Sequence, residues 1–137
     1  MWILYAILSA VFASLTAIFA KIGVKDVNSN LATAIRTIVV LFLIWGIVFF
    51  RGEHEGIAMI SKKNILFLFI SGLMTGLSWI FYFKALQEGP LSIIAPIDKL
   101  SVALTIVLAF VFLNEPVTLK AIAGTLLIIG GIIVLII

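Results

Sequence analysis

The sequence predicts an all-α integral membrane protein with five transmembrane helices. Of its residues, 64% are hydrophobic and 11% are charged, whereas ordinary soluble domains carry about 25% charged residues. The mean hydropathy is +1.38. Polar connections separate five apolar runs, each long enough for a spanning helix of about 20 residues. The runs cover residues 3–20, 31–50, 65–83, 92–113 and 119–137.

The same composition limits the domain organisation and excludes several classes of function. Nearly all of the 137 residues lie in apolar runs, so we expect a single membrane domain, 1–137, without an appended catalytic module. The nine Lys and Arg residues form no basic cluster, so nucleic acid is not an expected partner. Cysteine is absent, and the single histidine, His54, lies in a polar loop. We therefore expect no enzyme, no metal site and no cofactor.

Small residues mark the faces on which helices pack in the first, third and fifth runs. Ala10 and Ala17 belong to a series of alanines spaced three or four residues apart, which form one face of the first helix. Gly72 and Gly76 form a GxxxG pattern in the third run, and Gly124 lies in the fifth. Such residues let two backbones approach closely. The pattern favours packing within the chain over a contact between two copies, and leaves both open.

Polar and aromatic residues distinguish the second and third runs. Asn30 and Ser61 precede these runs and are the expected N-caps of their helices. The second helix then contains Arg36 inside the membrane. Trp79, Tyr82 and Phe83 lie at i, i+3 and i+4 near the end of the third helix. An aromatic belt at the membrane surface explains such residues more often than a substrate site does.

The fourth run contains a proline and two adjacent charges. Pro96 has no backbone donor, which leaves the carbonyl near Ser92 without its usual partner, and we expect a bend there. Transporters often place binding sites at broken helices. Asp98 and Lys99 point about 100° apart in a regular helix. We therefore expect them to face different neighbours and not each other.

Arg36, Asp98 and Lys99 fall inside the membrane near the same face, and ionisable groups there need a partner or water. One interpretation is an ion pair between Arg36 and Asp98 that joins the second and fourth helices. The other is a water-filled vestibule that attracts anionic or zwitterionic solutes, with Asp98 available to an ammonium group or a proton. The candidate substrate or pathway residues are Arg36, Trp79, Tyr82, Pro96, Asp98 and Lys99.

The basic residues of the connections are balanced between the two sides of the membrane. The side that holds the N-terminus receives Arg51, Lys62, Lys63 and Lys120, and the other side receives Lys21, Lys25 and Lys84. The positive-inside rule therefore gives no clear orientation. The balance is compatible with insertion in both orientations and with one orientation decided by one or two charges.

Four motifs in the second half of the chain point to a known family. They are WIFYFKALQEGP at 79–90, IAPIDKLSV at 94–102, FLNEP at 112–116 and GTLLIIGG at 124–131. With them the whole chain resembles one unit of the EamA family of the drug/metabolite transporter superfamily. The pair Asn114–Glu115 departs from the Gly-Glu that is more usual in that family.

The resemblance implies half of a transporter. Typical members carry two five-helix units related by an inverted repeat and move amino acids, metabolites or drugs. A half-size member then implies a partner: a second copy in an antiparallel homodimer, or a paralogue. The small multidrug resistance proteins of this superfamily use an acidic residue in helix one. Here helix one has none, and Asp98 is the only comparably placed acid.

Together these features predict a multi-pass protein in the lipid bilayer of a prokaryotic cytoplasmic membrane. The predicted function is a secondary transporter or facilitator of small organic solutes, namely metabolites, amino acids or drugs, which works by alternating access. The alternative is a non-transporting accessory subunit, or a heterodimer subunit, of another membrane protein.

Overall fold

The structure, a computed structural model, describes residues 1–137 and consists of helices and their connections. Five helical segments are long and apolar enough to cross a membrane, which confirms the predicted all-α fold class. The fourth of these segments, Leu91–Leu113, is divided into α4 and α5. The elements are α1 (Trp2–Gly23), α2 (Ser29–Phe50), the short 3₁₀-helix η1 (Glu53–Met59), α3 (Lys62–Glu88), α4 (Leu91–Asp98), α5 (Leu100–Leu113) and α6 (Leu119–Ile136).

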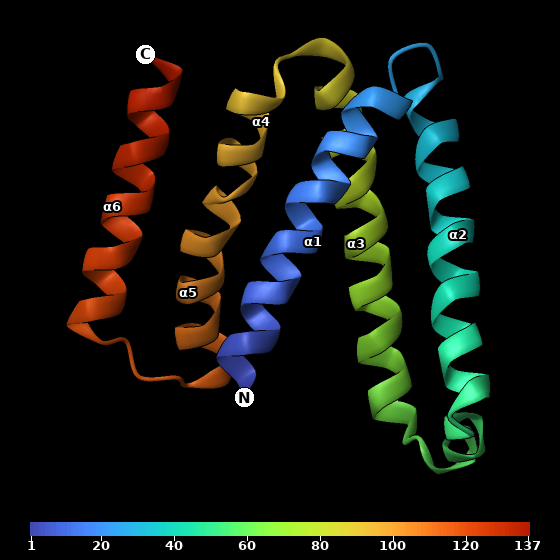
Figure 1. The fold of residues 1–137 in the computed structure, drawn as a ribbon. Helices are drawn as coiled ribbons and strands as arrows, with labels where there is room; N and C mark the ends of the chain where they lie inside the picture. The colour runs from blue at the N-terminus through green and yellow to red at the C-terminus, as the bar shows by residue number, and fades with distance from the viewer. The chain divides into compact units, whose positions relative to one another are not determined.

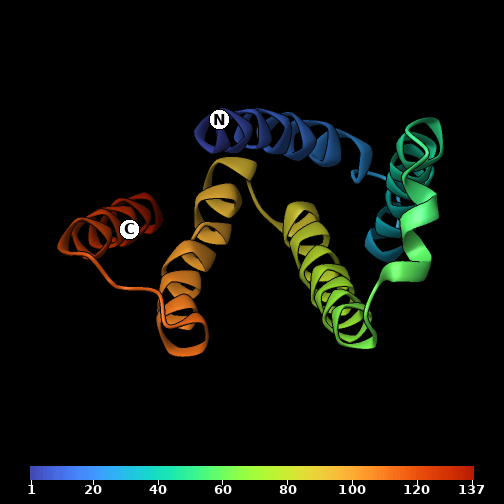
Figure 2. The ribbon, with the colours of Figure 1, turned by 90° about the horizontal axis from the view of Figure 1, so that it is seen from below.

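The chain divides into two compact units, Met1–Glu88 (unit 1) and Gly89–Ile137 (unit 2), and each is described by itself. The single domain expected over 1–137 stays a prediction. In unit 1, α2 and α3 run side by side in opposite directions, and η1 lies in the connection between them (Figure 1). α1 packs against α3 toward the C-terminal ends of both helices, and its first half diverges from α3 (Figure 2).

Side-chain caps determine where α2 and α3 begin. The Oδ1 atom of Asn28 accepts hydrogen bonds from the backbone N–H groups of Asn30, at 3.0 Å, and Leu31, at 3.3 Å. The expectation that Asn30 caps this helix is therefore wrong, because the extended backbone that a cap needs occurs at Asn28 (ψ 131°). The cap expected at Ser61 is confirmed, since its Oγ accepts from the N–H of Asn64 at 3.1 Å.

The core of unit 1 lies where the connection from α1 to α2 meets the last turns of α3. Lys21 Nζ donates to the carbonyl of Leu86, and Gln87 Nε2 donates to the carbonyls of Val24, at 3.0 Å, and Val27. The Leu86 carbonyl is one of the last carbonyls of α3, which have no partner inside the helix. The buried side chains of this unit are Ala17, Val24, Ser29, Thr33, Phe83 and Leu86.

Most large apolar side chains in both units point outward and are exposed, as expected where lipid is as apolar as the helices themselves. Of the expected packing residues, Ala17 is buried and Ala10 is exposed. A Cβ atom added at Gly72, Gly76 or Gly124 would meet no heavy atom within 4 Å. Close packing of another helix at these glycines therefore stays a prediction.

Unit 2 contains the helix interruption that separates α4 from α5. The Lys99 N–H donates to the carbonyl of Pro96 at 2.9 Å, three residues back, which is tighter than an α-helical bond. The helix is thus interrupted near Pro96, but at Lys99 and not at Ser92. The bend expected there stays a prediction. α5 and α6 run in opposite directions beside each other (Figure 1).

Candidate functional site

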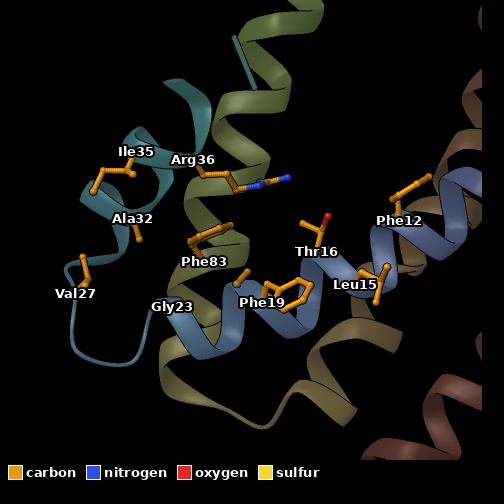
Figure 3. Close-up of a pocket in the computed structure, with 11 residues that line it drawn as sticks. Phe12, Leu15, Thr16, Phe19, Gly23, Val27, Ala32, Ile35, Arg36 and Phe83 are labelled. Carbon is orange, nitrogen blue, oxygen red and sulfur yellow. The ribbon is translucent and has the colours of Figure 1, made fainter. Parts of the chain in front are cut away.

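A cavity of about 620 Å³ lies among α1, α2 and α3 in unit 1 (Figure 3). Its volume falls within the range of about 300–1,000 Å³ that is usual for small-molecule sites. Most of its lining is apolar, and no acidic residue contributes to it. The aromatic and polar side chains that line it are Phe12, Thr16, Phe19, Arg36 and Phe83.

Helical spacing explains why these side chains meet. Phe12, Thr16 and Phe19 follow one another at intervals of four and three residues, so they share one face of α1. Ala32 and Arg36, four residues apart, line the cavity from α2. The small side chain of Ala32 leaves room on the turn that precedes the arginine. The cavity is therefore built from regular helix faces and not from a loop.

Arg36 is the only charged residue in the lining, and aromatic rings hold it in place. Its Cζ atom lies 4.1 Å from the ring centroid of Trp79 and 5.5 Å from that of Phe83. Cation–π contacts of this kind stabilise a guanidinium without neutralising it. Figure 3 shows the side chain leading from α2 toward the face of α1 that carries Thr16.

No carboxylate of unit 1 pairs with Arg36. The ion pair inside this unit joins Arg51 and Glu53, at 3.0 Å, in the connection between α2 and α3. At about 1.5 Å per residue, Arg36 lies about 10 Å along α2 from its first residue, inside the apolar span. A charge there needs a counter-charge or water. The cavity thus contains a cation whose hydrogen-bond donors are available to an anion.

Thr16 supplies a second available polar group. Hydroxyls on membrane helices commonly donate to the carbonyl four residues back, as Thr33 and Thr37 do at 2.8 Å. The hydroxyl of Thr16 makes no such bond and lines the cavity opposite α2. It can therefore donate to, or accept from, a bound molecule.

Three of the predicted pathway residues lie close together in unit 1. Arg36 lies over Trp79, and the ring of Tyr82 meets that of Phe83 edge-on, with centroids 6.5 Å apart. Trp79 and Phe83 are four residues apart and share the face of α3 that meets Arg36. A belt at the membrane surface does not by itself account for this stacking.

The other predicted pathway residues lie together in unit 2, at the interruption after α4. Lys99 Nζ donates to Asp98 Oδ2 at 3.0 Å, so the expectation that these side chains face different neighbours is wrong. The helix is not regular at Lys99, and a long flexible side chain can turn back to the preceding residue. Pro96 belongs to the same last turn of α4. The ion pair expected between Arg36 and Asp98 would join the two units and stays a prediction.

Sequence reasoning missed the residues that α1 contributes, namely Phe12, Thr16 and Phe19. Their shared spacing on one helix face was a visible signal. The alanines of the same helix predicted a packing face, but only Ala17 among them is buried in the core of unit 1.

Comparison with known proteins decides the family. The family model described as the EamA-like transporter family matches residues 1–137. The chain belongs to this family. The uncharacterized transporter YvbV of Bacillus subtilis is 31% identical to this EamA protein over 132 residues. These residues cover 95% of this chain but 43% of YvbV, so this chain is about half the size of that relative.

Two other relatives of this EamA protein match over nearly their whole length. The uncharacterized transporter in the cobO 3′ region of Sinorhizobium is 43% identical over 134 residues, covering 98% of this chain and 95% of that protein. An uncharacterized protein of Methanocaldococcus jannaschii is 31% identical over 133 residues, covering 97% and 94%. No solved structure matches the chain. The EamA family and its five spans make the chain a multi-pass membrane protein and point to a transporter, not an enzyme.

Proposed function

We propose that this chain is a secondary transporter or facilitator of small organic solutes, namely metabolites, amino acids or drugs. The observation that carries the proposal is the cavity around Arg36, which lies between spanning helices of an EamA protein. Its volume suits one small molecule, and its lining combines apolar walls with two available polar groups, on Arg36 and Thr16. A purely structural bundle has no need to keep an unpaired guanidinium beside such a space.

The proposal includes a mechanism of alternating access in an antiparallel homodimer, in a prokaryotic cytoplasmic membrane. Alternating access in related folds needs two inverted repeats around one site, and this chain corresponds to one. The balanced basic residues of the two sides support insertion in both orientations. The exposed apolar faces and the open space beside Gly72 and Gly76 offer surface for a second copy. A paralogue in place of the second copy is the variation.

Purified protein reconstituted into vesicles tests the transport function. We expect flux of at least one solute from a panel of labelled amino acids, carboxylic acids, sugars and cationic drugs, above that of protein-free vesicles. Absence of flux for the whole panel would count against the proposal. Crosslinking in native membranes then separates two assemblies: a band at twice the chain mass supports the homodimer, whereas crosslinks only to other proteins favour an accessory subunit.

A further inference from the structure

The geometry points to a substrate class: we propose that Arg36 binds the carboxylate of a small organic monoanion whose apolar body lies against the aromatic walls of the unit 1 cavity. This inference rests on the proposed function, because the anion would be the transported solute. The walls are formed by Phe12, Phe19 and Phe83, and the polar end by Arg36 and Thr16.

The first step is the charge of the cavity. Arg36 is its only charged lining residue, and no carboxylate of unit 1 neutralises it. The nearby Lys21 directs its Nζ to the Leu86 carbonyl, in the core of the unit. The hydrogen bond keeps the Lys21 ammonium out of the lining, which therefore carries one positive charge, that of Arg36. A ligand with one negative charge brings the site to neutrality, whereas a dianion would leave a second charge unpaired.

The second step is the absence of an acid in the lining. An ammonium group needs a carboxylate, or several carbonyl acceptors, when it leaves water. Neither amines nor the ammonium end of a zwitterion find such a partner here. The cavity therefore favours a simple carboxylate over a cationic solute and over an amino acid.

The third step is the geometry around the guanidinium. Trp79 and Phe83 contact Arg36 through their ring faces, with Cζ 4.1 Å and 5.5 Å from the two centroids. No hydrogen bond or ion pair to a residue of unit 1 occupies the N–H groups of Arg36, so they can form two parallel bonds to a carboxylate. Thr16 extends from α1 on the side toward which Arg36 points, so its hydroxyl can donate a further bond (Figure 3).

Two other cavities of the chain lack this combination. A cavity of about 240 Å³ between α5 and α6 in unit 2 has no charged residue in its lining. A cavity of about 510 Å³ beside η1 is lined by Glu53, but this carboxylate already pairs with Arg51. Of these three cavities, the one around Arg36 joins apolar walls with an unpaired charge.

Three probes with one aromatic ring and different charges test the inference on the full chain in lipid nanodiscs: benzoate, benzamide and benzylamine. Binding is measured by titration calorimetry at pH 7.5. We expect benzoate to bind at least about tenfold more tightly than the neutral amide, because a charge-assisted bidentate contact is lost in the amide. Benzylamine should bind more weakly still. Equal affinity for benzamide, or tighter binding of benzylamine, would overturn the inference.

Variants locate the binding group. Arg36→Gln should weaken benzoate binding by about tenfold or more, and Arg36→Lys should weaken it less, since the charge stays but the planar fork is lost. Arg51→Gln makes the same change in an exposed connection and should stay within about twofold of the original affinity. Benzoate binding by folded Arg36→Gln at the original affinity would also overturn the inference. If Arg36→Gln does not fold, the Arg36→Lys variant and the three probes on the unchanged chain still test whether Arg36 binds the carboxylate.

Measurements of binding and of flux distinguish a failure of this inference from a failure of the proposed transport function. If the protein moves amines or neutral solutes but neither binds nor moves carboxylates, the inference is wrong and the transport function stands. If benzoate binds through Arg36 but no solute crosses the vesicle membrane, the assignment of the site stands and the proposed transport function is wrong.

Discussion

Arg36 and Trp79 show how a single residue can hold a charge inside an apolar span without neutralising it. Insertion scales assign a cost of about 2.5–3.5 kcal/mol to an arginine at the centre of a membrane helix. A cation–π contact away from water returns about 2 kcal/mol, and Arg36 lies on the N-terminal side of the centre of α2. The contact with Trp79 therefore makes a permanent acidic partner unnecessary.

A double-mutant cycle on Arg36→Met and Trp79→Leu measures this contact. We expect the free energy of unfolding, followed by circular dichroism during detergent titration of the purified protein, to show a coupling of about 1–2 kcal/mol between the two changes. The matched cycle uses Trp45→Leu, since Trp45 contacts Phe49 (centroids 5.5 Å apart) and not Arg36. Coupling as large in the Trp45 cycle would contradict a specific contact.

The sequence alone marks Arg36 as a candidate functional residue, because a charged side chain in an apolar run needs a partner or water. Its partner is harder to predict. Asp98 is the acid that charge balance favours, whereas the observed neighbours are aromatic rings on α3. Which helices pack together, and at which turns, follows from three-dimensional packing that a single sequence does not contain.

Among the elements, the C-terminal end of α3 is held by side-chain hydrogen bonds to the connection between α1 and α2. Lys21 and Gln87 together donate three hydrogen bonds to backbone carbonyls at this end of unit 1. Lipid cannot replace such partners. This end therefore acts as the rigid base of the cavity, while the first half of α1 diverges from α3 (Figure 1).

Replacing Gln87 by leucine tests the rigid base. The change removes the bonds to the carbonyls of Val24 and Val27, and we expect the free energy of unfolding to fall by about 1–3 kcal/mol. The neighbouring change Glu88→Gln should stay within about 0.5 kcal/mol, because that exposed side chain makes no hydrogen bond or ion pair. The same detergent titration measures both. Equal stability of the Gln87→Leu variant and the parent would refute the role of these bonds.

The interruption between α4 and α5 makes a separate prediction. In Pro96→Ala the backbone N–H can bond to the carbonyl of Ser92, so we expect a higher melting temperature for the purified protein. If the interruption takes part in the transport cycle, as broken helices do in other transporters, flux in vesicles should fall several-fold. A more stable variant with undiminished flux would show that the interruption is not needed for transport.

The existence and type of the elements were predictable, and their bounds were less so. Long apolar runs identify all five spans, but α3 continues to Glu88, beyond the apolar run that ends at 83. Its last turns are polar, and the bonds of Gln87 to the preceding connection stabilise them. The start of α2 was placed too late because Asn28 and Asn30 are equally good caps by residue type.

At the scale of the whole molecule, the open glycines of α3 are the clearest surface for a second copy. In Gly76→Leu the new Cβ atom meets no heavy atom within 4 Å, and leucine favours the helix by about 1 kcal/mol over glycine, so the chain should fold. We expect crosslinked dimer and flux both to fall severalfold. Gly46→Leu, at an equally open glycine of α2, is the control. Undiminished dimer in Gly76→Leu would exclude this face as the interface.

The balance of basic residues gives the strongest test of an antiparallel pair. Replacing Lys62 and Lys63 by glutamine leaves more positive charge on the side of Lys25 and Lys84, and that side should then stay in the cytoplasm. Copies of one orientation cannot form an antiparallel dimer, so flux should be lost. The opposite variant, Lys25→Gln with Lys84→Gln, should likewise be inactive alone.

Co-expression of the two oppositely biased variants should restore flux, because each supplies one orientation. Protease accessibility of a C-terminal tag in intact cells measures the orientation of each variant, and the unchanged chain should show both orientations in comparable amounts. The parent chain could instead adopt a single orientation and still transport. In that case the two halves of the transporter cannot be antiparallel copies of this chain, and a paralogue of opposite orientation becomes the required partner.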